Sequence, residues 1–373
     1  MSPAVRPPVW IPSDRPVIAG YAGAGFDRVR PDGWLCGGGG RCSHAEHRHQ
    51  HQHGIFECGL GVNRGRGKLG AVAASFEGMA ASRLNWLLGA QNPDGGWGYS
   101  QGKASWLEPT AYALRALGAW AMLDRMVPSG RRAQRYIDRL QRADGGWQAS
   151  ALVFESHWSG ALWLGLEGAS RERHARWLAG LRWLVAEKGM DGGWIRRVAA
   201  RLDPEAVEQD MALRGWPWLA GTNSWVEPTC HAMLALSRDS LAVDMPGRAA
   251  RLEEGRRLLL DRRCRDGGWN YGNRRVRGHD LPSYPQTTAL ALLTLKRCGV
   301  ADLQASVEQA QRQWADPSVS RLARVWLALA LREAGHPVQL DESGASQGSA
   351  TGMIVDTITA ALEAAAWSSQ GYA

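Results

Sequence analysis

The tetrapeptide Asp-Gly-Gly-Trp occurs four times in this 373-residue chain, beginning at Asp94, Asp144, Asp191 and Asp266. A recurring element of this kind indicates a repeat architecture, in which each copy marks one supersecondary unit that packs against its neighbours. Aspartate can bond to local backbone N–H groups, paired glycines permit positive φ, and tryptophan buries a large ring. We therefore expect the four copies to join structural repeats and not to form active sites.

Each tetrapeptide lies between two helical patterns of different character. The segments before it, such as 131–141 and 251–263, are amphipathic and carry a charged face. The segments after it, such as 157–166 and 287–295, are nearly all apolar. A half-polar helix covers a surface, whereas a helix that is apolar all round is enclosed or faces a cavity. The sequence therefore predicts an all-α fold, an α/α toroid of five to six helical hairpins with inner and outer helices.

The first 70 residues differ from the rest of the chain. They are rich in Gly, Pro, Arg and His and lack the apolar periodicity of a helix. We expect residues 1–70 to be a disordered tail and residues 71–373 to form the toroid domain. Three cysteines and five histidines gather at 36–58, so a zinc site is an alternative, although their spacing matches no common zinc module. Another alternative is that translation starts at Met79 and that the residues before it are not translated.

Composition narrows the class of partner. A hydrophobic content of 45% is sufficient for a sizeable core, and the net charge of +8 comes from basic residues scattered among acids. There is no dense basic block of the kind that binds nucleic acid. No apolar run approaches the roughly 18 residues of a membrane-spanning helix, and the first residues contain no apolar secretory segment. The six cysteines form no regular framework, so we expect a cytoplasmic protein; peripheral membrane contact and the oligomeric state stay open.

One run of residues is nearly duplicated, at 106–117 and 225–236, and each copy contains Trp-x-Glu-Pro-Thr. Proline is well placed in the first turn of a helix, because the N–H group that it lacks would have no partner there. Each copy is therefore predicted to begin an inner helix, with Glu108 or Glu227 in its first turn. A glutamate there is favoured by the helix macrodipole and can accept backbone N–H bonds. It would also face the mouth of a cavity, so a catalytic role is compatible with capping.

The segments 91–97 (Gln-Asn-Pro-Asp-Gly-Gly-Trp) and 141–147 (Gln-Arg-Ala-Asp-Gly-Gly-Trp) resemble the QW motifs of the terpenoid cyclase and protein prenyltransferase superfamily. The copies at Asp191 and Asp266 keep the tetrapeptide but lack the leading glutamine. The resemblance covers roughly residues 72–335. It implies a squalene–hopene cyclase-like repeat protein with an α/α barrel, whereas function must be argued from the site itself.

In the class II cyclases of this superfamily, an Asp-x-Asp-Asp-Thr-Ala run opens an inner helix, and its middle aspartate protonates an alkene or epoxide. Aligning that run with the threonines of this chain places Glu108, Glu227 and Gln286 at the protonating position. The resemblance therefore implies Glu227 and Glu108 as catalytic acids or orienting groups, with Gln286 in contact with substrate. It also implies substrate contacts from rings near the inner-helix starts, although core packing explains any single one equally well. These rings are Trp106, Tyr112, Trp158, Trp163, Trp225, His231 and Tyr284.

The chain departs from the cyclase pattern in one respect. Asp-x-Asp-Asp is absent, and Pro109 and Pro228 stand where relatives carry the neighbouring acid. A lone glutamate in an apolar cavity has a raised pKa, which keeps it protonated but makes it a weaker acid. We expect a terpene cyclase-like isomerase or prenyltransferase-like enzyme, without a cofactor, that acts on or binds a hydrophobic isoprenoid, either polyprenyl or triterpenoid. The alternative is a non-catalytic isoprenoid-binding or interaction scaffold.

A zinc-dependent prenyltransferase-like enzyme is a second alternative. Those enzymes carry zinc on an Asp-x-Cys pair and a later histidine, whereas here Cys230 is one position out of register and Gln286 stands where the histidine would be. The pair Cys230-His231 also resembles zinc ligands of lanthipeptide cyclases, but the Trp-Cys-Tyr-Gly element of that family is missing. We therefore expect no metal site in the toroid.

The third repeat contains extra residues. Trp225 follows Trp194 by 31 positions, whereas Trp106 follows Trp97 by nine. The extra residues include an acidic stretch at 203–210 and then Gly-Trp-Pro-Trp. They form either a lid over the cavity mouth or an ordinary surface excursion.

Overall fold

The computed structural model describes residues 78, 80–120, 127–166, 174–192, 209–238, 245–340 and 356–367. The chain divides into two units, Met1–Val62 and Asn63–Ala373, and every described residue belongs to the second. The predicted tail with its zinc alternative, the predicted boundary at residue 70, Met79, Trp194 and the acids at 203, 205 and 208 lie outside the described residues. Those predictions stay predictions.

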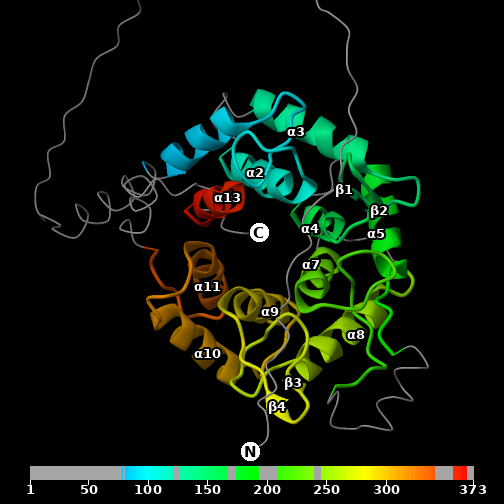
Figure 1. Cartoon of the computed structure of the whole chain (residues 1–373), viewed down its shortest axis with the longest axis vertical. Helices are drawn as coiled ribbons and strands as arrows, with labels where there is room; N and C mark the ends of the chain where they lie inside the picture. The colour runs from blue at the N-terminus through cyan, green and yellow to red at the C-terminus, as the bar shows by residue number, and fades with distance from the viewer. Residues whose placement is uncertain are drawn as a thin grey trace, which may run out of the picture. The chain divides into compact units, whose positions relative to one another are not determined.

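Six helices form a closed inner ring in the described part of the chain (Figure 1). Each inner helix contacts the next, and the last contacts the first. Most of their residues are buried, and in the third helix every residue is buried. The six are α2 (Leu107–Ala119), α4 (Ser159–Leu166), α7 (Val226–Leu236), α9 (Pro285–Arg297), α11 (Arg321–Glu333) and α13 (Thr357–Ala366).

The amphipathic helices, whose charged residues other than Arg251 are half-buried or exposed, lie outside this ring (Figure 1). They are the helix 80–90, α3 (Val127–Leu140), α5 (His174–Ala186), α8 (Arg248–Asp261) and α10 (Gln304–Ala315). The predicted all-α toroid is therefore confirmed. Two short antiparallel hairpins, which the helical periodicity did not predict, lie in the connections: β1 (Gln148–Ser150) with β2 (Val153–Ser156), and β3 (Arg275–Val276) with β4 (His279–Asp280). None of the helices in the described part combines the length and the apolar character that a bilayer crossing needs.

The tetrapeptide tryptophans join each outer helix to the inner helix that follows it. The indole Nε1 of Trp97 donates to the carbonyl of Leu87 at 2.8 Å, near the end of the outer helix. The backbone N–H of Trp97 donates at 2.9 Å to the hydroxyl of Thr110 on the inner helix. Trp269 repeats both bonds in the fourth unit, with Leu259 and Thr288. Trp97 and Trp269 are buried and bonded to both helices, so these two copies are structural joints, as predicted. Trp147 is buried as well, but its Nε1 atom has no hydrogen-bond partner among the described residues.

In the third unit the same two bonds are made by Trp216, which lies outside a tetrapeptide. The Nε1 of Trp216 donates to the carbonyl of Leu184 at 2.7 Å, and its N–H donates to Thr229 at 3.1 Å. Trp216 also precedes Trp225 by nine positions, the spacing of the first unit. The joint tryptophan of the third unit therefore lies at the end of the extra residues and not in the tetrapeptide that precedes them.

The last inner helix is tied to the first repeat, so the ring closes within one chain. Glu363 of α13 is completely buried and accepts hydrogen bonds from Arg83 of the helix 80–90, at 2.6 Å, and from Arg321 of α11. The indole of Trp120 donates to the carbonyl of Ala364 at 2.9 Å. These contacts join residues near the beginning of the toroid's sequence to residues near its end.

Candidate functional site

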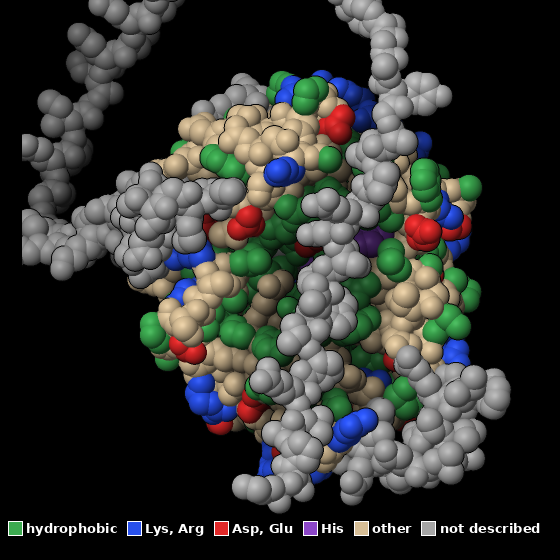
Figure 2. All heavy atoms as spheres, in the orientation of Figure 1, with side chains coloured by type: hydrophobic (Ala, Val, Ile, Leu, Met, Phe, Trp, Pro, Cys, Tyr) green, Lys and Arg blue, Asp and Glu red, His purple; other side chains and the backbone are tan. Residues whose placement is uncertain are grey.

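The inner helices begin at a common level. Four residues just before these helices donate their backbone N–H to the carbonyl of a tryptophan at 2.8–3.1 Å: Trp106 to Trp97, His157 to Trp147, Trp225 to Trp216 and Tyr284 to Trp269. Residues two positions after each of these donors therefore form one layer at the entrance of the ring. That layer contains Glu108, Ser159, Glu227 and Gln286. Figure 2 shows a hollow at the centre of the ring whose visible wall is largely hydrophobic.

Glu227 is a buried acid in this layer. Its side chain lies in the first turn of α7, where every other residue is buried and mostly apolar, and the residue is only 7% exposed. Burial, and then the negative charge of Glu108, raise the pKa of Glu227 to about 8. No residue in the described ranges donates a hydrogen bond to its carboxyl group. Glu227 therefore carries its proton at neutral pH.

Glu108 is half-buried in the first turn of α2 and accepts a hydrogen bond from the hydroxyl of Tyr99 at 2.6 Å. Burial raises the pKa of Glu108 to about 7, against the lowering effect of the Tyr99 bond. The helix α4 separates α2 from α7 in the ring, yet the charge of Glu108 raises the pKa of Glu227. The two carboxyl groups are therefore close enough to interact electrostatically.

The capping interpretation of these glutamates is not observed. Within the described residues, neither carboxyl group accepts a backbone N–H bond, and the N-caps Trp106 and Trp225 have no side-chain cap bond. Their charge still lies at the positive end of a helix macrodipole, which favours the ionised form. Burial outweighs that effect, because the pKa of both groups is raised.

Aromatic side chains contact one another one helical turn after the glutamates. Tyr112 lies four residues after Glu108, and His231 lies four residues after Glu227, so each shares a helix face with its glutamate. Trp326 of α11 contacts both rings, with centroids 6.3 Å from Tyr112 and 6.2 Å from His231. The chain of rings continues from His231 to Trp158 and on to Trp218, at 5.2 and 4.9 Å.

His231 is a neutral polar group inside this aromatic layer. Burial lowers the pKa of its imidazole to about 3. Its Nε2 atom is buried without a hydrogen-bond partner among the described residues. A buried polar atom left without a partner is destabilising by about 1–3 kcal/mol, so this atom points to a ligand or water in the hollow.

The residues predicted to contact substrate lie in three places. Tyr112, Trp158, Trp163 and His231 are buried in the inner ring, whereas Gln286 is half-buried in the entrance layer. The three aromatic caps lie at the rim: Trp106 is half-buried, Trp225 is 38% exposed and Tyr284 is 44% exposed.

Sequence reasoning missed Tyr99, Trp218 and Trp326. Trp326 follows its N-cap Ser320 by six positions, the same register as Tyr112 after Trp106. The fifth unit lacks the tetrapeptide, so that register could not be assigned from the sequence.

The described residues contain no group of three or more His, Cys, Asp or Glu side chains placed to hold a metal ion. Burial raises the pKa of the Cys230 thiol well above its usual range, which disfavours the thiolate that zinc requires.

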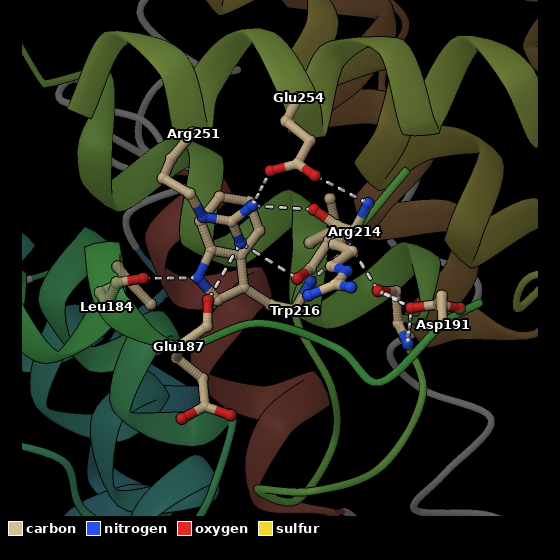
Figure 3. A network of polar contacts seen from close by, with 10 residues as sticks. Leu184, Glu187, Asp191, Arg214, Trp216, Arg251 and Glu254 are labelled. Carbon is tan, nitrogen blue, oxygen red and sulfur yellow. Dashed lines mark hydrogen bonds and ion pairs between the residues drawn. The ribbon is translucent and has the colours of Figure 1, made fainter. Parts of the chain in front are cut away.

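Arg251 fixes the chain where the insertion returns to the ring (Figure 3). Its guanidinium lies 3.9 Å from the ring centroid of Trp216 and pairs with Glu254 at 2.6 Å. It also donates to three backbone carbonyls at 2.8–3.1 Å, those of Arg214, Glu187 and Gly215. The joint tryptophan of the third unit is thus held by α5, α7 and α8 together.

No family model and no curated protein sequence matches this chain. Among solved structures, the type II terpene cyclase MstE from Scytonema is similar at 16% identity and a TM-score of 0.44, over 70% of this chain and 73% of that one. A protein from Actinoplanes is similar at 20% identity and a TM-score of 0.42, over 74% and 80%. Cellobiose 2-epimerase from Spirochaeta thermophila DSM 6192 is similar at 12% identity and a TM-score of 0.48, over 79% and 84%. At such low values these similarities carry no inference about activity.

Proposed function

We propose that this chain is a terpenoid cyclase-like or prenyltransferase-like enzyme that takes a hydrophobic isoprenoid into the central hollow and uses Glu227 as its acid. The observation that carries the proposal is the state of Glu227. It is a buried carboxyl group whose pKa is raised to about 8, in the entrance layer above a set of aromatic rings. An acid that keeps its proton at neutral pH inside an apolar space suits proton transfer to a substrate that water cannot reach.

In the proposed reaction, the carboxyl proton of Glu227 passes to the substrate, leaving a carboxylate on the enzyme and a cation on the substrate. The faces of Trp158, Trp326 and Tyr112 supply negative electrostatic potential near such a cation. His231 stays neutral and therefore does not repel it.

The raised pKa also limits which substrates Glu227 can protonate. A weaker acid transfers its proton more slowly to a poor acceptor such as an isolated alkene. The proposal therefore favours an isoprenoid with a more basic acceptor, such as an epoxide oxygen. Glu108, bonded to Tyr99, has the role of an orienting group.

Incubation of the full chain with squalene, oxidosqualene and prenyl diphosphates, followed by mass spectrometry of the products, tests the proposal. We expect conversion of an oxygenated isoprenoid by the wild type and a loss of roughly 100-fold or more in Glu227→Gln, the range of general acid catalysis. The matched control is Glu308→Gln, which changes an exposed glutamate on α10 and should leave conversion intact. If all substrates stay unchanged and Glu227→Gln alters no binding, the proposal is wrong.

A second candidate is a non-catalytic isoprenoid-binding protein, favoured by the absence of an acid next to Glu227 in the sequence. Lipid extraction of the purified chain followed by mass spectrometry distinguishes it, because a bound isoprenoid would be recovered without any turnover. A cytoplasmic location with peripheral membrane contact also remains a proposal, which vesicle flotation tests.

A further inference from the structure

Three aromatic side chains meet across the interior of the inner ring. Around this ring, α9 lies between α7 and α11, and α13 lies between α11 and α2 (Figure 1). Trp326 of α11 nevertheless contacts His231 of α7 and Tyr112 of α2, with ring centroids 6.2 and 6.3 Å apart. A contact between helices that are not neighbours in a closed ring crosses its interior. His231 is therefore on the inner side of the ring, where a ligand in the central hollow would lie.

His231 differs from the buried threonines of the inner helices, which form hydrogen bonds within the chain. The hydroxyl of Thr229 accepts the backbone N–H of Trp216 at 3.1 Å, and that of Thr294 donates to the carbonyl of Leu290 at 2.8 Å. His231 is only 2% exposed, and its Nε2 atom is buried without a hydrogen-bond partner among the described residues. A buried polar atom of this kind is destabilising unless a bound molecule supplies the missing hydrogen bond.

We propose that His231 is a specificity-determining residue that binds a hydroxyl group of the isoprenoid. This inference rests on the proposed isoprenoid ligand and adds a second polar group to it, apart from the group that receives the proton of Glu227. His231 follows Glu227 by four residues on α7, about 6 Å further along the helix axis. The two contacts are therefore made at different depths of the ring.

A hydroxyl group fits the imidazole of His231 in either of its neutral forms. Burial lowers the pKa of His231 to about 3, so the ring is neutral and has one donor and one acceptor nitrogen. A hydroxyl group can accept from the first or donate to the second. The rings of Trp158 and Trp326, with centroids 5.2 and 6.2 Å from that of His231, offer apolar surface to the hydrocarbon part of the same molecule.

Two probes that differ only in the hydroxyl group test the inference on the full chain. They are farnesol and the triene hydrocarbon with the same carbon skeleton, with binding measured by equilibrium dialysis and mass spectrometry. His231→Phe keeps a buried aromatic ring and removes both nitrogens. We expect it to weaken farnesol binding about fivefold to a hundredfold, since a buried hydroxyl loses its partner, and to leave hydrocarbon binding unchanged. The matched control is His336→Phe, at an exposed histidine, which should change neither affinity.

Two further measurements separate ligand binding from packing. Farnesol should shift an imidazole nitrogen resonance in NMR that is missing in His231→Phe, and the hydrocarbon should leave that resonance in place. The melting temperature of ligand-free His231→Phe should not fall below that of the wild type, because the substitution removes an unpartnered polar atom. Equal weakening of both probes in His231→Phe would mean that the ring only packs. Unchanged farnesol affinity would mean that no hydroxyl is bound there. Either result overturns the inference.

The variant Glu227→Gln distinguishes failure of this inference from failure of the proposed acid. If the wild type converts no isoprenoid but farnesol binding still depends on His231, the role of Glu227 is wrong and the hydroxyl contact holds. If Glu227→Gln abolishes conversion but His231→Phe weakens neither probe, the acid holds and the hydroxyl contact is wrong. Failure of both probes to bind the wild type overturns both.

Discussion

Replacing Glu227 with glutamine should change how the stability of this protein depends on pH. The ordinary pKa of the glutamate carboxyl is 4.5, and in the folded protein it rises to about 8. Below the ordinary pKa, both the folded and the unfolded chain hold the proton, so the acid does not lower the free energy of unfolding. As the pH rises, the unfolded chain releases the proton while the folded chain keeps it. Stability is therefore lost with rising pH, until the folded carboxyl also ionises at about pH 8.

The size of this loss follows from the difference in pKa. One pKa unit corresponds to about 1.4 kcal/mol. Between about pH 5.5 and about pH 8.5, the free energy of unfolding of the wild type should fall by about 3 kcal/mol through Glu227 alone. Glutamine resembles the protonated acid in shape and does not titrate, so Glu227→Gln should lack this decrease.

Equilibrium unfolding in guanidinium chloride, followed by circular dichroism at several pH values, measures the effect. The quantity to compare is the difference in unfolding free energy between wild type and Glu227→Gln, because other titrating groups cancel in it. The control Glu308→Gln changes an exposed acid and should parallel the wild type at every pH. Parallel curves for wild type and Glu227→Gln would show that the acid is ionised in the folded protein and would refute both the burial argument and its proposed role.

Two further predictions concern the joints of the ring. Glu363→Gln removes the buried carboxylate that two arginines contact, and should lower the unfolding free energy by about 3–5 kcal/mol; Glu333→Gln, at a partly exposed ion pair, should lower it by no more than about 1 kcal/mol in the same denaturation assay. Trp216→Phe leaves a buried carbonyl without its indole donor and should be destabilising by about 1–3 kcal/mol, as should Trp97→Phe. A much milder effect at Trp216 than at Trp97 would contradict its assignment as the third joint.

The toroid was predictable because its determinants are local and repeated. The alternation of amphipathic and apolar helices distinguishes outer from inner positions without any knowledge of long-range contacts. The position of Glu227 was predictable for the same reason, since Pro228 and Thr229 mark the first turn of a helix.

Contacts between distant segments were not predictable in this way. Trp216 makes the bonds of the third joint although it lies outside a tetrapeptide, so the tetrapeptide pattern could not identify it. The ion pair of Glu363 with Arg83 joins residues 280 positions apart. The β3–β4 hairpin has strands only two residues long, too short to give an alternating pattern in the sequence.

The second acid of the site also comes from a long-range contact. The sequence places proline directly after each glutamate, so neither has an acidic neighbour on its own helix. The fold instead brings Glu108 of α2 into the electrostatic environment of Glu227 on α7. Glu108 has the lower pKa of the two, and its bond from Tyr99 favours the ionised form, so it ionises first as the pH rises. Its negative charge then raises the pKa of Glu227 and keeps the proton on it. Glu108 therefore makes Glu227 a weaker acid. It follows that Glu108→Gln should lower the pKa of Glu227, so that the pH-dependent loss of stability is smaller and ends at a lower pH.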